Sequence, residues 1–312
     1  MWLELYYQDS QRDVEDIVKK GSVLIVYTRG LNCSPTANET RALSLNRSVA
    51  FIKTKQFAAA LADSNSAIVA TGTTEKALTR KLQELYSLER FQECCEILKG
   101  LLKENPSNAA AQDELARATK RLAEQETGSY EFNKFHEAAN KLRPPLLDDA
   151  TYIGPVVVKE AASYGRGLFT TKEVKAEGLL LCEKAFGFVY ADPEHRRDVT
   201  LVYEMGTNQL WFGANTELIR VIAQKMYANT SLTSVITDLH ADGYRSADVA
   251  EMESQWSTPV VDTFQFERII DANAFGSQNS AAQNHIEETL YKREGIAINQ
   301  GKSSFHSLAS GR

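Results

Sequence analysis

Two stretches of this chain repeat at a separation of thirty-four residues. Residues 46–57 align with residues 80–91, and farther on Gly72 is matched by Pro106. A period of this length is typical of two antiparallel helices followed by a helix-breaking residue. Because one such hairpin cannot bury its apolar side chains alone, neighbouring hairpins must stack. The repeat therefore predicts an all-helical solenoid in the first part of the chain.

The side chains of the repeat suit this packing. Small residues stand where two helices approach closely, and large residues stand where side chains must fill the space between helix pairs. The small ones are Ser48, Ala60, Ala67 and Cys94, and the large ones are Phe51, Phe57, Leu85 and Phe91. A less regular unit ends at residues 27–31, and a helix over residues 107–124 is expected to cap the array. The segment resembles the tetratricopeptide repeat (TPR) family, so residues 1–125 are expected to form TPR helical repeats with a capping helix.

Three polar residues fall at positions that the TPR resemblance links to peptide binding. TPR domains that hold the acidic C-terminal tails of heat-shock chaperones use an Asn in one repeat and a Lys and an Arg in the next. Asn46, Lys76 and Arg80 match those positions, and two cations four residues apart can engage one carboxylate together. The resemblance implies a protein or peptide partner in the TPR groove, such as a chaperone tail. In the alternative interpretation, Asn46 and Arg80 satisfy helix ends and contact solvent.

The pattern changes near Pro144 and Pro145, because paired prolines prevent a helix from continuing. Residues 126–150 are therefore expected to be a linker. Short apolar runs after it predict strands, and residues 191–259 return to helical periodicity. One helical face in that stretch is expected to pack on the small sheet and carries Leu218, Val221, Ile222 and Met226.

A six-residue motif, Tyr164–Phe169, places two glycines between apolar runs. Since neither Gly165 nor Gly167 has a Cβ, the backbone can bend sharply there and a ligand can approach main-chain groups. With Tyr152–Pro155 before it and Thr171–Leu181 after it, the motif resembles the opening of a SET domain, the fold of many protein-lysine methyltransferases. This resemblance implies that residues 151–276 form the N-terminal part of a SET domain with a helical insert, and that the whole chain is α+β.

The SET resemblance implies S-adenosylmethionine as the cofactor, bound by main-chain groups of Gly165 and Gly167 and covered by Arg166. It also implies methyl transfer to a protein lysine, a reaction that depends on holding a neutral amine in line with the methyl group inside a dry channel. Taken alone, the glycine pair also fits a plain hairpin turn, and Arg166 an exposed turn residue. No residue is predicted to be catalytic or to bind a metal.

The sequence after Gly276 departs from the SET pattern. SET enzymes carry an Asn-His-Ser-Cys motif after the helix that Val260–Gly276 resembles, and a later tyrosine lines their reaction channel. Here Asn284-His285 is followed by Ile286-Glu287, and Tyr291 lacks that context. These residues are expected to be solvated, and residues 277–312 to form a disordered tail.

Three functions therefore stay open. The first is a protein-lysine methyltransferase whose TPR array selects the partner. The second is a non-catalytic interaction protein in which the TPR helices bind a peptide and the SET remnant is inactive. The third is an incomplete gene product, truncated before the Asn-His-Ser-Cys motif.

The composition is that of a globular protein and argues against nucleic acid and membranes as partners. Of the 312 residues, 43% are hydrophobic and 24% charged, which is typical of a globular protein. The formal net charge of −6 argues against a nucleic-acid partner, because phosphate binding needs concentrated Lys and Arg. No apolar run reaches the length of a membrane span. The four cysteines lack the spacing of a zinc site and are expected to be reduced thiols, so we expect a cytoplasmic or nuclear protein.

Overall fold

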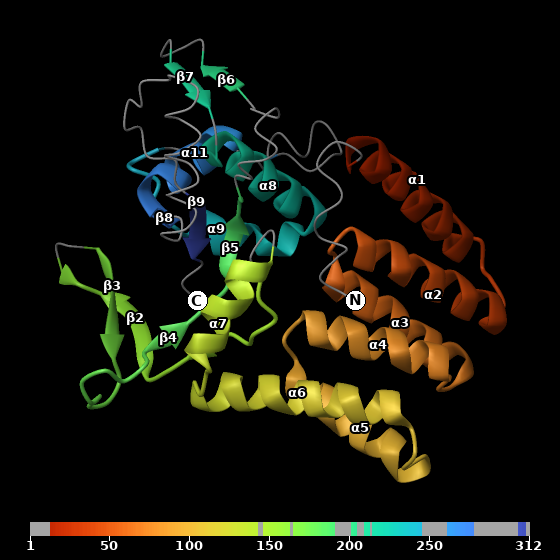
Figure 1. Ribbon diagram of the computed structural model, residues 1–312. Coiled ribbons are helices and arrows are strands. Elements are labelled where there is room, and N and C mark those ends of the chain that lie inside the picture. The colour runs from red at the N-terminus through yellow and green to blue at the C-terminus, as the bar shows by residue number, and fades with distance from the viewer. Residues whose placement is uncertain are drawn as a thin grey trace, which may run out of the picture. The chain divides into compact units, whose positions relative to one another are not determined.

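The computed structural model describes residues 13–142, 146–162, 165–190, 201–204, 209–212, 214–244, 261–277 and 305–309. The chain divides into two units, Met1–Glu183 and Lys184–Arg312. Helices followed by short strands form the first unit, and short strands mixed with helices form the second (Figure 1). The described structure is mostly helical with small antiparallel sheets, in agreement with the predicted α+β class.

Six successive helices build the first part of the first unit. They are α1 (Asp13–Asn32), α2 (Ala37–Lys53), α3 (Phe57–Thr71), α4 (Glu75–Ser87), α5 (Phe91–Glu104) and α6 (Ala109–Thr127). Each helix contacts the next one along the chain, and α2 also contacts α4 (Figure 1). Because α3 and α5 begin thirty-four residues apart, the sequence repeat corresponds to successive helical hairpins.

The hairpins bury most of the side chains that the repeat pattern selects. All four small residues, Ser48, Ala60, Ala67 and Cys94, are buried, as are Leu85 and Phe91. The ring of Phe91 meets the ring of Tyr86 edge to face, with centroids 5.1 Å apart. Phe51 and Phe57 are only half-buried, so these two rings lie at the margin of the hydrophobic core.

Polar side chains fix where three of these helices begin. At α2, Thr36 Oγ1 accepts a hydrogen bond from the Glu39 N–H at 3.4 Å, and Glu39 Oε2 accepts one from the Thr36 N–H at 2.8 Å. Thr74 caps α4 and Asn108 caps α6 through their side-chain oxygens. Each such cap contributes about 1 kcal/mol, so the helix starts are encoded locally.

The segment predicted to be a linker, residues 126–150, contains a helix. Helix α7 (Phe132–Lys141) begins beside an aromatic cluster of Tyr130, Phe132 and Phe135, whose ring centroids lie 5.5 to 5.8 Å apart. Pro144 and Pro145 lie outside the described residues. Residues 128–131 and 146–150 have no regular secondary structure, so only helix α7 and the end of α6 interrupt the predicted linker in the described residues.

Two small antiparallel pairs of strands complete the first unit. Strand β1 (Tyr152–Ile153) pairs with β4 (Leu181–Cys182). Strand β2 (Val156–Glu160) pairs with β3 (Arg166–Thr170) in a hairpin, with Val158 opposite Leu168.

The second unit packs helices on a three-stranded sheet. Its elements are β5 (Ala185–Phe188), β6 (Leu201–Glu204), β7 (Gln209–Phe212), α8 (Ala214–Ala228), the 3-10 helix η4 (Thr230–Leu232), α9 (Thr233–Thr237), α11 (Thr263–Asn273), β8 (Ala274–Ser277) and β9 (Phe305–Ala309). The sheet has the antiparallel order β5-β9-β8 (Figure 1). A Cβ added to Gly187 of β5 would lie 2.9 Å from Leu218 and 3.1 Å from Ile222, so α8 packs closely on this strand.

The helical face predicted in α8 is the one that enters the core. Leu218, Ile222 and Met226 are buried in one cluster with Ile269 of α11, and Val221 packs against that cluster. Two other expectations need correction. Strands β6 and β7 pair with each other inside the stretch 191–259, so helical periodicity is the wrong prediction there. Strand β9 lies within the tail predicted to be disordered.

Within the described residues, no helix is both long and apolar enough to cross a lipid bilayer.

Candidate functional site

The first glycine of the motif, Gly165, lies in the turn of the β2–β3 hairpin, whereas Arg166 to Phe169 lie in strand β3, where Gly167 pairs with Lys159. The Ala161 N–H donates a hydrogen bond to the Gly165 carbonyl oxygen at 2.6 Å, which closes the turn. Gly165 has a φ of +76°, a backbone conformation that glycine adopts without strain. Tyr164 lies outside the described residues. The predicted bend between two strands is therefore found at Gly165, but the prediction is wrong for Arg166 and Gly167, which belong to the paired strand β3.

The space beside the first glycine is open. A Cβ built on Gly165 would meet nothing within 4 Å, whereas one on Gly167 would lie 3.1 Å from the Phe169 ring. Gly165 and Arg166 are exposed, and Gly167 is half-buried. A ligand can thus approach the main chain at Gly165, which fits a group held by main-chain contacts. The side chain of Phe169 covers the second glycine.

The three residues predicted to bind a peptide lie on two neighbouring helices. Asn46 is exposed on α2, and Lys76 is exposed in the first turn of α4. Arg80 follows one turn later on α4 and is half-buried, with its Nη1 donating to Gln83 Oε1 at 3.4 Å. Lys76 and Arg80 are therefore adjacent on one helix, as predicted, but Arg80 is turned toward the protein and Lys76 toward solvent.

A buried polar network, which the sequence did not predict, lies behind Arg80. Arg47 of α2 donates two hydrogen bonds to Asp63 of α3, at 2.7 and 2.6 Å, and these raise the pKa of Arg47. Ser64 Oγ donates to Glu84 Oε1 at 2.8 Å, and Glu84 is fully buried. Burial raises the pKa of Glu84 to about 7, against the opposing hydrogen bond from Ser64. Polar side chains thus join α2 to α3 within one hairpin, and α3 to α4 between two hairpins.

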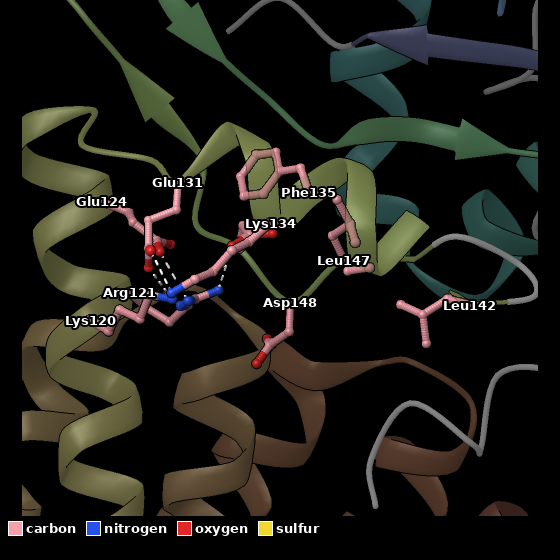
Figure 2. A pocket seen from close by; sticks show the side chains of 11 residues that line it. Lys120, Arg121, Glu124, Glu131, Lys134, Phe135, Leu142, Leu147 and Asp148 are labelled. Atoms are coloured by element: carbon pink, nitrogen blue, oxygen red, sulfur yellow. Dashed lines mark hydrogen bonds and ion pairs between the residues drawn. The ribbon is translucent and has the colours of Figure 1, made fainter. Parts of the chain in front are cut away.

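A pocket of about 240 Å³ lies between α6, α7 and the segment that follows α7 (Figure 2). It is lined by Lys120, Arg121, Glu124, Glu131, Lys134, Phe135, Ala138, Leu142, Leu147, Asp148 and Asp149. Glu131 lies 3.5 Å from Lys120 Nζ and 2.5 Å from Lys134 Nζ, and Arg121 lies 2.9 Å from both Glu124 and Asp149. Each cation of the lining is therefore paired with a carboxylate of the chain itself.

Two residues of this lining, Asp148 and Asp149, are bound by side chains of α4 and α6. The sequence held a signal for this contact, because Arg117 and Arg121 lie four residues apart on one face of α6 and the two aspartates are adjacent. In the described part of the chain, no group of three or more His, Cys, Asp or Glu is placed to hold a metal ion.

The sequence matches no protein-family model and no solved structure. It is 34% identical over 277 residues to a protein named methyltransferase from Gibberella zeae, a match that covers 88% of this chain and 38% of that relative. It is 29% identical over 100 residues to RNA polymerase II-associated protein 3 from Homo sapiens, covering 32% of this chain and 15% of that relative. This chain is therefore a homologue of a protein named methyltransferase over most of its length, and it spans less than half of either relative.

Proposed function

We propose that this chain is the partner-binding and cofactor-binding part of an S-adenosylmethionine-dependent protein-lysine methyltransferase of the SET class. The identity to a protein named methyltransferase, 34% over 277 residues, is the observation that carries the proposal. The glycine hairpin after the helical hairpins supports the SET assignment, because that order matches the resemblance described above. The helical hairpins are proposed to be TPR units that select the protein substrate, in the cytoplasm or nucleus.

S-adenosylmethionine would supply an electrophilic methyl group carried on a sulfonium. In this chain the main chain at Gly165 and Gly167 would hold the cofactor, and the Arg166 side chain would cover it. The open space beside Gly165 supports that role. The Asn-His-Ser-Cys motif of the class is not in this sequence. The proposal therefore assigns cofactor binding, and no catalytic residue, to the residues printed here.

Isothermal titration calorimetry with S-adenosylmethionine tests the proposal on the full chain and on a Gly165→Ala variant. An alanine at a φ of +76° strains the turn, so we expect the affinity of the variant to fall at least tenfold. Gly72→Ala is the matched control, because Gly72 has a φ of +83° and equally open surroundings in the loop between α3 and α4. Absence of binding heat at high protein concentration would remove the cofactor-binding proposal.

A second candidate is a non-catalytic module that binds a protein partner through its helical hairpins. The similarity to RNA polymerase II-associated protein 3, a protein named for its association with another protein, favours this candidate. Exposed Asn46 and Lys76, with Arg80 beside them, would contact an acidic peptide tail such as that of a chaperone. Peptide binding by a chain that gives no heat with S-adenosylmethionine would favour this module over the enzyme.

A further inference from the structure

A short acidic part of the chain lies against the last helices of the array. We call residues 147–151 the acidic segment, and the segment has no regular secondary structure. Asp148 Oδ2 accepts hydrogen bonds from Tyr86 Oη at 2.9 Å and from Arg117 Nε at 3.0 Å. Asp149 Oδ1 accepts one from Arg121 Nη1 at 2.9 Å. Two adjacent carboxylates thus bind two arginines of α6 and a tyrosine of α4.

The backbone after the two aspartates is bound as well. The Ala150 N–H donates to Glu124 Oε2 at 3.1 Å, and the Thr151 N–H donates to Glu89 Oε2 at 3.0 Å. Tyr130 Oη donates to the Ala150 carbonyl oxygen at 2.7 Å. Three side chains therefore bind backbone groups of the acidic segment, and any extended peptide carries such groups. They belong to Glu89, Glu124 and Tyr130.

The charges in this contact are complementary. Burial alone would raise the pKa of Asp148, but the hydrogen bond and positive charge of Arg117 outweigh burial and hold that pKa below its ordinary value. The Arg117 guanidinium also stacks 4.1 Å from the centroid of the Tyr86 ring, which fixes its orientation. The Arg121 side chain is 7% exposed and bridges Asp149 and Glu124. Asp148 is therefore held in the ionised form.

The contact lies at the surface of the array. The side chains of Asp148 and Asp149 keep 34% and 19% of their surface exposed, and neither belongs to the hydrophobic cores. Arg117 and Arg121 are not among the residues of the hydrophobic core, whereas Tyr86 packs against that core and Ala150 of the acidic segment is buried. The two carboxylates can therefore separate from the arginines without a helix being unpacked, although Ala150 has to leave a buried position.

We propose that Tyr86, Arg117, Arg121 and Glu124, the α6 site, form a receptor for an extended peptide with two adjacent acidic side chains. The chain fills the α6 site with its own Asp148 and Asp149, and an acidic segment of a partner protein takes their place when they leave. Arginine suits this role because its fork of N–H donors matches a carboxylate. The inference does not depend on methyl transfer, and the α6 site is separate from Asn46, Lys76 and Arg80.

A peptide with the sequence of residues 146–153 and a fluorescent label provides the probe, and fluorescence anisotropy with the full chain measures its affinity. In an Asp148→Arg/Asp149→Arg variant, Arg117 and Arg121 repel the chain's own segment and the α6 site opens. We expect this variant to bind the peptide at least tenfold more tightly than the original chain. A peptide with Asn in place of both Asp residues should bind at least tenfold more weakly.

Two further variants assign the binding to the α6 site. Adding Arg117→Gln and Arg121→Gln to the opened variant should abolish binding. Adding Arg90→Gln should leave binding unchanged, because Arg90 pairs with the exposed Glu93 on α5. Equal affinity for the original and opened chains overturns the proposal, as does no binding by an opened chain with the original circular dichroism spectrum. If the double-arginine variant does not fold, Asp148→Asn/Asp149→Asn replaces it as the opened chain. Equal peptide affinity for this variant and the original chain, or no binding by this variant when it is folded, would again overturn the proposal.

Discussion

The carboxyl group of Glu84 makes the stability of the helical array depend on pH. Glu84 is fully buried on α4, and burial raises its pKa to about 7, whereas an exposed glutamate has a pKa near 4.3. Below about pH 4.5 the group is protonated in the folded and unfolded chain alike. As the pH rises toward 7, only the unfolded chain loses the proton, so the free energy of unfolding falls.

A Glu84→Gln variant should remove this dependence, because the amide stays neutral and still accepts the hydrogen bond from Ser64. One pKa unit corresponds to about 1.4 kcal/mol, so we expect the original chain to lose about 3 kcal/mol between pH 4.5 and 7 relative to the variant. Urea unfolding at several pH values measures the difference. Glu93→Gln on the exposed face of α5 is the control. Parallel stability curves for the original chain and Glu84→Gln would contradict the prediction.

Helix α6 ends at Gly128, where a larger residue meets a neighbouring side chain. Gly128 has a φ of +67°, and a Cβ built on it would lie 2.7 Å from Cε1 of Tyr152 in β1. With a ψ of +22°, Gly128 is in the left-handed helical region, which alanine can adopt at a modest cost. The main cost of a larger residue at this position is therefore the contact with the Tyr152 ring.

We expect Gly128→Ala to lower the free energy of unfolding by about 1–3 kcal/mol through the contact with the Tyr152 ring, since overpacking costs that amount in a fitted contact. A Tyr152→Ala substitution removes the clashing ring, so Gly128→Ala should cost less when it is made in a Tyr152→Ala chain than in the original chain. Chemical denaturation of the two single variants and the double variant measures the difference. An equal cost of Gly128→Ala in both chains would show that the Tyr152 ring moves aside without cost.

The thirty-four-residue helical repeat could be predicted from the sequence because its apolar and small residues recur locally. The caps Thr74 and Asn108, which also stand thirty-four residues apart and start α4 and α6, were not among the predicted residues. The bend at Gly165 is equally local. Glu84 was not anticipated, because its partner Ser64 lies on another helix and nothing in the helical period marks a buried carboxyl.

Contacts between residues far apart in the sequence were not predicted. Asp148 binds Tyr86, sixty-two residues earlier, and the paired prolines after α7 favoured a solvated linker instead. Strand β9 pairs with β5 across more than one hundred residues, although its composition favours disorder. Such pairings depend on the tertiary surface that the rest of the chain presents, which neither spacing nor composition reports.

Each unit of the chain has a hydrophobic core of its own, and the two cores predict separate responses to substitution. Leu85 is fully buried in the first unit and Ile222 in the second. Truncation to alanine at such a site costs about 2–5 kcal/mol. We expect Leu85→Ala to increase amide hydrogen exchange in α2 to α6 and leave α8 and α11 unchanged, and Ile222→Ala to do the reverse. Mass spectrometry of proteolytic fragments locates the exchange, and a rise throughout the chain in both variants would show one cooperative core instead of two.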